Sequence, residues 1–121
     1  IRESPSLFSV RLSGNILIIT PQRNVSSLTE QRVQDEVNMV LDRFRDPLLK
    51  NVLIDFGKIS YFGAAMLEMM RLIANRIQDR KGQMAVCGVS HVGAEILQIT
   101  KFDIAWPNYV SRANALDRML K

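Results

Sequence analysis

Short apolar runs alternate along the chain with longer amphipathic stretches, a pattern typical of strands followed by helices. Residues 7–12 (LFSVRL) alternate between apolar and polar side chains, which predicts a half-exposed strand. Residues 16–20 (ILIIT) are continuously apolar up to the threonine and predict a buried strand. Residues 13–15 (SGN) are typical of a turn, so the chain is predicted to open with a β-hairpin that ends at Pro21.

A first helix is predicted over about residues 28 to 45. Ser27 and Glu30 have the spacing of a capping box, in which each side chain bonds the other's backbone amide. Asp46-Pro47 is expected to end the helix. Its apolar side chains fall on one face: Val33, Val37, Val40, Leu41 and Phe44.

A central strand and the clearest helix follow. Residues 52–56 (VLIDF) predict a buried strand with Asp55 at its carboxyl end, and residues 57–63 predict a loop. Residues 64–80 predict a helix, and Gly82 lies where glycines commonly follow a helix. The apolar residues of this helix share one face, and its methionines are expected to fill the core: Met66, Met69, Met70, Ile73 and Ile77.

The last third of the chain predicts four shorter elements. Residues 83–89 (QMAVCGV) indicate a buried strand, and residues 92–99 a short helix that Ser90 is placed to begin. Residues 104–106 predict a short strand stopped by Pro107. Residues 111–120 predict a final helix with Ser111 as its N-cap.

This order, β-β-α-β-α-β-α-β-α, predicts an α/β fold. Strands that alternate with helices favour parallel pairing, whereas the opening hairpin adds one antiparallel pair. The sequence therefore predicts a mixed, mostly parallel sheet of about five strands with about four helices. The 121 residues are expected to form a single domain, residues 1–121.

Composition and charge fit an ordinary globular chain. Apolar residues make up 47% and charged residues 23%, and the formal net charge is +4. The basic residues are interleaved with acids, and even the cluster at residues 76–81 is split by Asp79. A nucleic-acid partner is not predicted, because such proteins usually gather their basic residues in one patch.

A few residues bear on the cellular compartment of the protein and on whether it could be an enzyme. The single cysteine, Cys87, excludes an internal disulfide and fits the cytoplasm, where it is expected to be buried and inert. No apolar run reaches the roughly 18 residues of a membrane span. Gly57-Lys58 is followed by Ile59, so it is not a phosphate-binding loop. His91 is the only histidine and the one candidate general base, and the sequence predicts no enzyme, metal or cofactor.

Residues 54–65 (IDFGKISYFGAA) are the most unusual stretch. A buried strand leads through a loop with Tyr61 and Phe62 directly into a helix, whose N-terminal amides favour an anion. At least one of the two aromatic side chains is expected to fill the core below the loop. This stretch, together with the element order, resembles the STAS domain family, the bacterial anti-sigma factor antagonists.

The resemblance covers nearly the whole chain. The family motif runs Asp-Leu-Ser-x-Val-x-Phe-x-Asp-Ser-Ser/Thr-Gly-Leu, and residues 55–67 read DFGKISYFGAAML. Residues 83–90 and 97–102 also look like the family's fourth strand and the segment after it. In the family, an anti-sigma kinase phosphorylates the first serine after the second Asp of that motif, and the added charge ends the complex. Ala64 stands at the acceptor position and Gly63 at the Asp before it, so the motif is degenerate.

Three interpretations follow from the resemblance. The preferred one is a non-catalytic, anti-sigma factor antagonist-like module that binds an anti-sigma factor or histidine-kinase-like protein, either constitutively or as partner abundance allows. In the second, Ser60 is a displaced phosphoacceptor. In the third, the domain binds a small ligand or serves as an assembly subunit. The expected contact residues, which include a turn that lacks the family's acid, are Arg23, Asn24, Ser26, Lys58, Ser60, Tyr61, Phe62, Gly63, Ala64 and Ala65.

Overall fold

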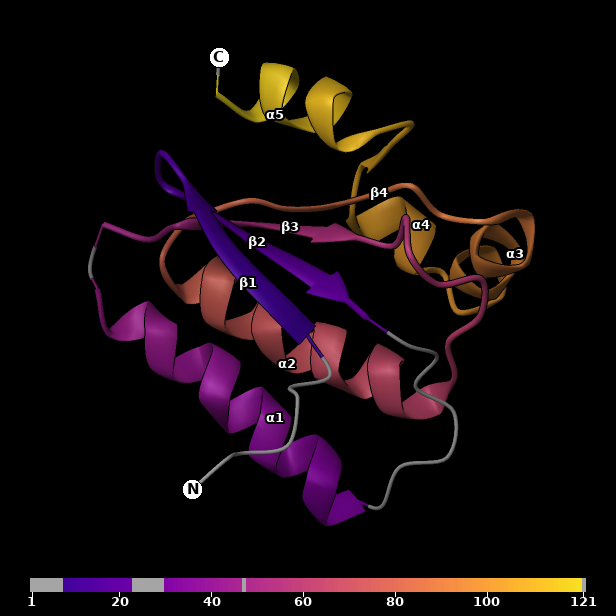
Figure 1. The fold of residues 1–121 in the computed structure, drawn as a ribbon, viewed down its shortest axis with the longest axis horizontal. Helices are drawn as coiled ribbons and strands as arrows, with labels where there is room; N and C mark the ends of the chain where they lie inside the picture. Colours follow the sequence, from indigo (N-terminus) through magenta and orange to yellow (C-terminus); the bar gives the residue numbers. More distant parts are fainter. Residues whose placement is uncertain (1–7, 23–29, 47, 121) are drawn as a thin grey trace.

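A computed structural model describes residues 8–22, 30–46 and 48–120 and shows one sheet with helices on both faces (Figure 1). The strands are β1 (Phe8–Ser13), β2 (Ile16–Pro21), β3 (Asn51–Asp55), β4 (Met84–Cys87) and β5 (Asn108–Tyr109). The helices are α1 (Glu30–Asp42), continued by the 3-10 turn η1 (Arg43–Arg45), α2 (Ala64–Asp79), α3 (His91–Ile99), α4 (Phe102–Ala105) and α5 (Arg112–Met119).

The five strands lie in the order of the chain, β1-β2-β3-β4-β5. β1 pairs with β2 in the antiparallel sense, and every later pair is parallel. The predicted mixed, mostly parallel sheet is therefore confirmed. Because β2, β3 and β4 advance in one direction, crossovers of one hand place α1 and α2 on the same face of the sheet (Figure 1).

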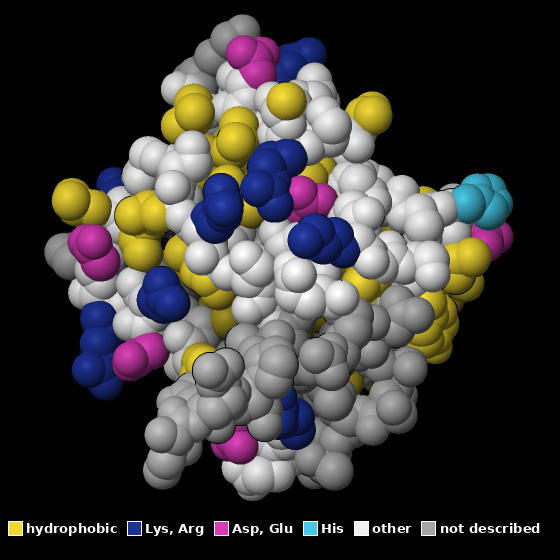
Figure 2. Space-filling model, viewed as in Figure 1, with side chains coloured by type: hydrophobic (Ala, Val, Ile, Leu, Met, Phe, Trp, Pro, Cys, Tyr) yellow, Lys and Arg dark blue, Asp and Glu magenta, His cyan; other side chains and the backbone are white. Residues whose placement is uncertain are grey.

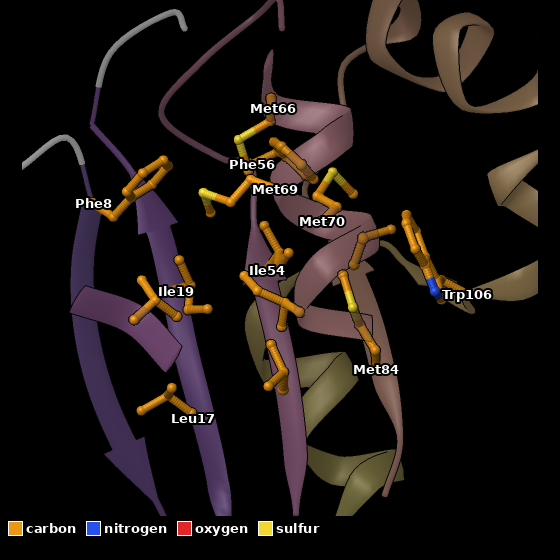
Figure 3. Packing of buried hydrophobic residues seen from close by; sticks show 14 of the residues in the cluster. Phe8, Leu17, Ile19, Ile54, Phe56, Met66, Met69, Met70, Met84 and Trp106 are labelled. Carbon is orange, nitrogen blue, oxygen red and sulfur yellow. The ribbon is translucent and has the colours of Figure 1, made fainter. Parts of the chain in front are cut away.

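The main core fills the space between the sheet and helices α1 and α2. Side chains that alternate along the strands point into it, among them Leu17, Ile19 and Ile54, and the methionines of α2 meet them there (Figure 3). Met66, Met69 and Met70 are all at most 1% exposed, which confirms their predicted core role. Trp106 closes the edge of this core beside Met84 (Figure 3).

A smaller core lies on the opposite face, under α5. The alternate residues of the same strands, including Ile18 and Leu53, pack there against Ala115 of α5. Both faces of β2 are thus covered, which explains why its sequence is an unbroken apolar run. Helix α5 does not reach across β1, whose outer residues on this side are polar.

Helix starts agree with the sequence where the structure describes them. The Ser90 hydroxyl accepts a hydrogen bond from the Gly93 amide at 3.0 Å, and the Ser111 hydroxyl accepts one from the Asn114 amide at 3.2 Å, so both predicted N-caps are confirmed. Ser27 of the expected capping box lies outside the described residues, as do the side chains of Val33 and Phe44. Val37 and Val40 are buried against the core as predicted.

The predicted strand at residues 104–106 is wrong, and within the described residues a short helix takes its place. Residues 102–105 form the single turn α4, and the last strand is Asn108–Tyr109. The helical turn brings Phe102 under Trp106, where their rings stack with centroids 4.6 Å apart. Burying Trp106 in this way leaves Ile104 80% exposed, whereas a strand would have buried alternate residues.

The end of α2 differs from the expected glycine cap. Lys81, not Gly82, adopts the left-handed conformation, with φ of 60°. Gly82 is required for a different reason, because a Cβ atom there would lie 1.5 Å from the carbonyl oxygen of Lys50. The end of α2 therefore passes directly against the backbone that leads into β3.

Gly82→Ala is expected to destabilise the fold by about 2 kcal/mol or more, because the backbone of Lys50 would have to move. Gly63→Ala is the matched control, since its new Cβ would lie 3.5 Å from the Tyr61 hydroxyl, an ordinary contact. That control should cost no more than about 1 kcal/mol, the loss of a glycine N-cap. Urea denaturation measures both values, and equal costs would contradict the close approach.

Candidate functional site

The loop between β3 and α2, residues 57–63, is fixed at its start by backbone and carboxylate contacts. The Gly57 amide donates to Oδ1 of Asp55 at 2.9 Å, which folds the chain sharply after β3. The Phe56 amide donates to the Cys87 carbonyl at 2.8 Å, and the Ile59 amide to the Phe56 carbonyl at 3.2 Å. The loop therefore leaves the sheet in a defined direction.

The two loop aromatics have different surroundings. Phe62 is 2% exposed and stacks on Phe56, with ring centroids 4.6 Å apart. A Cβ atom on Gly93 would lie 3.0 Å from the Phe62 ring, so α3 packs closely against it. Tyr61 is 43% exposed. Phe62 thus supports the loop from below, as expected for one of the two aromatics, and of the two it is Tyr61 that offers its ring to solvent.

Ser60 joins the loop to α3 through its backbone. Its carbonyl accepts a hydrogen bond from the Ser90 hydroxyl at 2.8 Å, and the same hydroxyl oxygen caps α3 by accepting from the Gly93 amide. One serine side chain therefore holds the loop and the start of α3 together. The Ser60 residue itself remains exposed.

Helix α2 begins at Ala64, which is exposed. Its N-cap, Gly63, has an extended backbone and no side chain to bond the first-turn amides, and no acidic residue lies in that turn. The amides of the first turn therefore point outward with their partial positive charge uncompensated by a side chain. The start of α2 is a polar, positive surface beside Tyr61.

The structure brings together most of the predicted contact residues. Lys58, Ser60, Tyr61 and Ala64 are exposed on the loop and helix start, and Gly63 and Ala65 are half-buried between them. Lys58 points back toward β2, where its Nζ lies 3.5 Å from Oε1 of Gln22. Three predicted contacts fall outside the described residues: Arg23, Asn24 and Ser26.

One arrangement was missed by reasoning from the sequence. Oδ2 of Asp55 accepts a hydrogen bond from Nε of Arg112 at 2.9 Å, and Nη2 of the same arginine donates to the Thr20 hydroxyl at 2.9 Å. Asp55 is 15% exposed at its side chain, so its charge needs such a partner. An acid inside an apolar strand was the available signal, but the sequence did not indicate which cation would meet it.

Cys87 lies directly under this arrangement, in the smaller core. Burial raises the pKa of its thiol to about 12, and the negative charge of Asp55 adds to the effect. The thiol is therefore neutral at physiological pH, in agreement with the expectation that it is inert.

The other candidate chemistry has no partners in the described part of the chain. His91 is exposed at the start of α3, and no described serine or acid forms a hydrogen bond with it. The residues that the structure describes include no group of three or more His, Cys, Asp or Glu side chains placed to hold a metal ion. None of the described helices has the length and apolar character needed to cross a membrane.

The sequence profile of the STAS domain matches residues 2–115. The chain belongs to the STAS domain family. A curated relative of this STAS chain, from Bordetella bronchiseptica, bears the name "Putative anti-sigma factor antagonist BtrV". The two are 24% identical over 100 residues, which cover 83% of each protein.

Solved structures agree with this membership. An anti-sigma factor antagonist (STAS) domain protein from Planctomyces limnophilus is 27% identical and superimposes with a TM-score of 0.78, over 94% of this chain and 98% of that one. Unphosphorylated SpoIIAA, also an anti-sigma factor antagonist, shares the fold with a TM-score of 0.75 at 12% identity, over 92% of this chain and 94% of its own. A second structure shows SpoIIAA of Bacillus in its phosphorylated form. The STAS fold of anti-sigma factor antagonists is thus shown for this chain, and this family consists in general of non-catalytic interaction modules.

The raised pKa of Cys87 predicts a loss of stability in alkali. An unfolded chain loses the thiol proton near pH 9, whereas the folded STAS domain retains it up to about pH 12, so the free energy of unfolding falls as pH rises between these values. Between about pH 8 and about pH 10 the loss should amount to about 1 kcal/mol. Cys87→Ala removes this ionisation. Between about pH 8 and about pH 10 the free energy of unfolding of the variant should therefore fall by about 1 kcal/mol less than that of the wild type. Identical pH profiles in urea titrations would show that the thiol ionises equally in both states.

Proposed function

We propose that this STAS domain is a non-catalytic module of bacterial signalling that binds an anti-sigma factor or a histidine-kinase-like protein. The observation that carries the proposal is an exposed alanine, Ala64, on the first turn of α2 beside the exposed ring of Tyr61. The name of BtrV and the two forms of SpoIIAA support this class of partner.

The proposed contact surface has an aromatic centre and a basic side. Tyr61 supplies an exposed ring on a loop that the buried Phe62 anchors to the core, and exposed aromatic side chains commonly contribute much of the binding energy. Val92 is 46% exposed on α3, whose start is bonded to the loop through Ser90 and Ser60, and it extends the apolar area. Lys58 adds a positive charge that favours an acidic partner and speeds the encounter.

The module is proposed to stay in its binding state. A phosphate on the first turn of α2 would bring roughly −1.5 to −2 charges to the contact surface and repel an acidic partner. Ala64 has no hydroxyl to accept one. The complex is therefore regulated through the abundance of its partner rather than by phosphorylation at this residue.

Ala64→Asp is expected to weaken partner binding about tenfold or more, because it places a negative charge at the centre of the surface. Asn75→Asp is the matched control: it adds the same charge at an exposed position further along α2 and should bind like the wild type. Affinity capture from native cell lysate with all three proteins, followed by mass spectrometry of bound proteins and of the bait, makes the comparison. Equal capture by wild type and Ala64→Asp would show that the partner does not bind this surface. Phosphate found on Ser60 of the bait would show that the module is regulated by phosphorylation at Ser60 and is not constitutive.

Tyr61→Ala should lower the affinity for the captured partner about tenfold while leaving the free energy of unfolding within about 0.5 kcal/mol of wild type. Phe62→Ala should instead cost about 3 kcal/mol or more in stability, because it empties a buried ring site. Leu48→Ala, at a position 75% exposed, is the control for loss of an exposed apolar side chain. Calorimetric titration and urea denaturation separate the two effects. Unchanged affinity in Tyr61→Ala would mean that the partner binds elsewhere.

A further inference from the structure

A basic depression lies on the α5 side of the sheet, where β2 ends and β1 runs alongside. Its volume is about 310 Å³, and its lining residues are Ser9, Arg11, Thr20, Gln22, Lys58 and Arg112. The smaller core under α5 includes residues of β2, β3 and β4 and none of β1. On β1, Ser9 and Arg11 alternate with the buried Phe8 and therefore face this side.

Positive charge dominates the depression. Arg11, Lys58 and Arg112 carry three positive charges, and the adjoining Asp55 carries one negative charge, which leaves two positive charges in excess. Lys and Arg side chains also gather around an acidic side chain on the face shown in Figure 2. Such an excess, concentrated in one concave region, attracts anions.

The nearby acceptors are already engaged. Both oxygens of Asp55 accept hydrogen bonds, one from the Gly57 amide and one from Nε of Arg112. The Thr20 hydroxyl accepts from Nη2 of Arg112, and Oε1 of Gln22 lies 3.5 Å from Nζ of Lys58. The charged groups that line the depression, Arg11, Lys58 and Arg112, can only donate hydrogen bonds.

The two guanidinium groups at the depression have donors without a described partner. Arg112 is oriented by Asp55 and Thr20, yet no described residue accepts a hydrogen bond from its Nη1. Within the described chain Arg11 forms neither a hydrogen bond nor an ion pair, and it is exposed. A guanidinium oriented by two side chains, beside an exposed guanidinium and a lysine, is an arrangement suited to a tetrahedral oxyanion.

We propose that this depression binds a phosphomonoester group. The two excess positive charges match a dianion, and the volume is at the lower end of the range for ligand sites, about 300 Å³, which suits a phosphate group with little attached to it. The group can be carried by a small metabolite or by a phosphorylated protein side chain. The depression shares Lys58 with the proposed partner surface, whereas its other lining residues lie on β1, on and just after β2, and on α5.

The test is a titration of the isotope-labelled chain followed by NMR at constant ionic strength. The probes are inorganic phosphate, glycerol phosphate, a short phosphoserine peptide and, as a monoanionic comparison, benzenesulfonate. We expect saturable shifts of the Thr20, Gln22 and Arg112 amides with the phosphates and at least about fivefold weaker binding of benzenesulfonate. Tighter binding of glycerol phosphate than of the peptide indicates a metabolite, and the reverse order indicates a phosphorylated side chain.

Substitutions locate the site. Arg11→Gln and Lys58→Gln should each weaken phosphate binding about tenfold, because each removes a charged donor. Arg76→Gln removes an exposed arginine on α2, away from the lining residues, and should leave the affinity unchanged. Three results would overturn the proposal: no saturable shift, equal weakening in Arg76→Gln, or shifts confined to the first amides of α2.

Discussion

Asp55 ends a strand that is buried on both faces, and a charged side chain in such a place is costly unless its oxygens are satisfied. Here one oxygen turns the chain into the loop before α2, and the other holds Arg112 at the start of α5. The same arginine reaches Thr20 at the end of β2. This one carboxylate therefore contacts the start of the loop and the start of α5, and it orients the arginine that lines the basic depression.

The proposed partner surface depends on the same junction. The shape of its loop depends on the hydrogen bonds at the start of the loop and on the residues below and beside it. Phe62 fills the space below, and the Ser90 hydroxyl bonds the loop backbone beside it. A surface held in this way presents Tyr61 with little loss of conformational freedom on binding, which is one source of affinity in interaction modules.

The sequence predicted the features that depend on local residue patterns. It did not predict the features that depend on contacts between residues far apart in the chain. Four strands, the long helices and two serine caps follow from periodicity and from short-range hydrogen bonds. The helical turn before Trp106 forms because its ring must cover the edge of the core. Gly82 is set by the passage of a distant backbone, and Arg112 meets Asp55 across 57 positions of the chain. Neither of these long-range contacts produces a periodic pattern in the sequence.

The sequential strand order has a consequence for how the molecule assembles. Each strand after the hairpin is added beside its predecessor, so the sheet can grow stepwise while the ends of each connecting segment remain close. The bond from Arg112 to Thr20 spans 92 positions and depends on the last helix. Because Arg112 lies on the last helix, its ion pair with Asp55 can form only when that helix docks against the sheet, and it then joins the end of β3 to the C-terminal part of the chain.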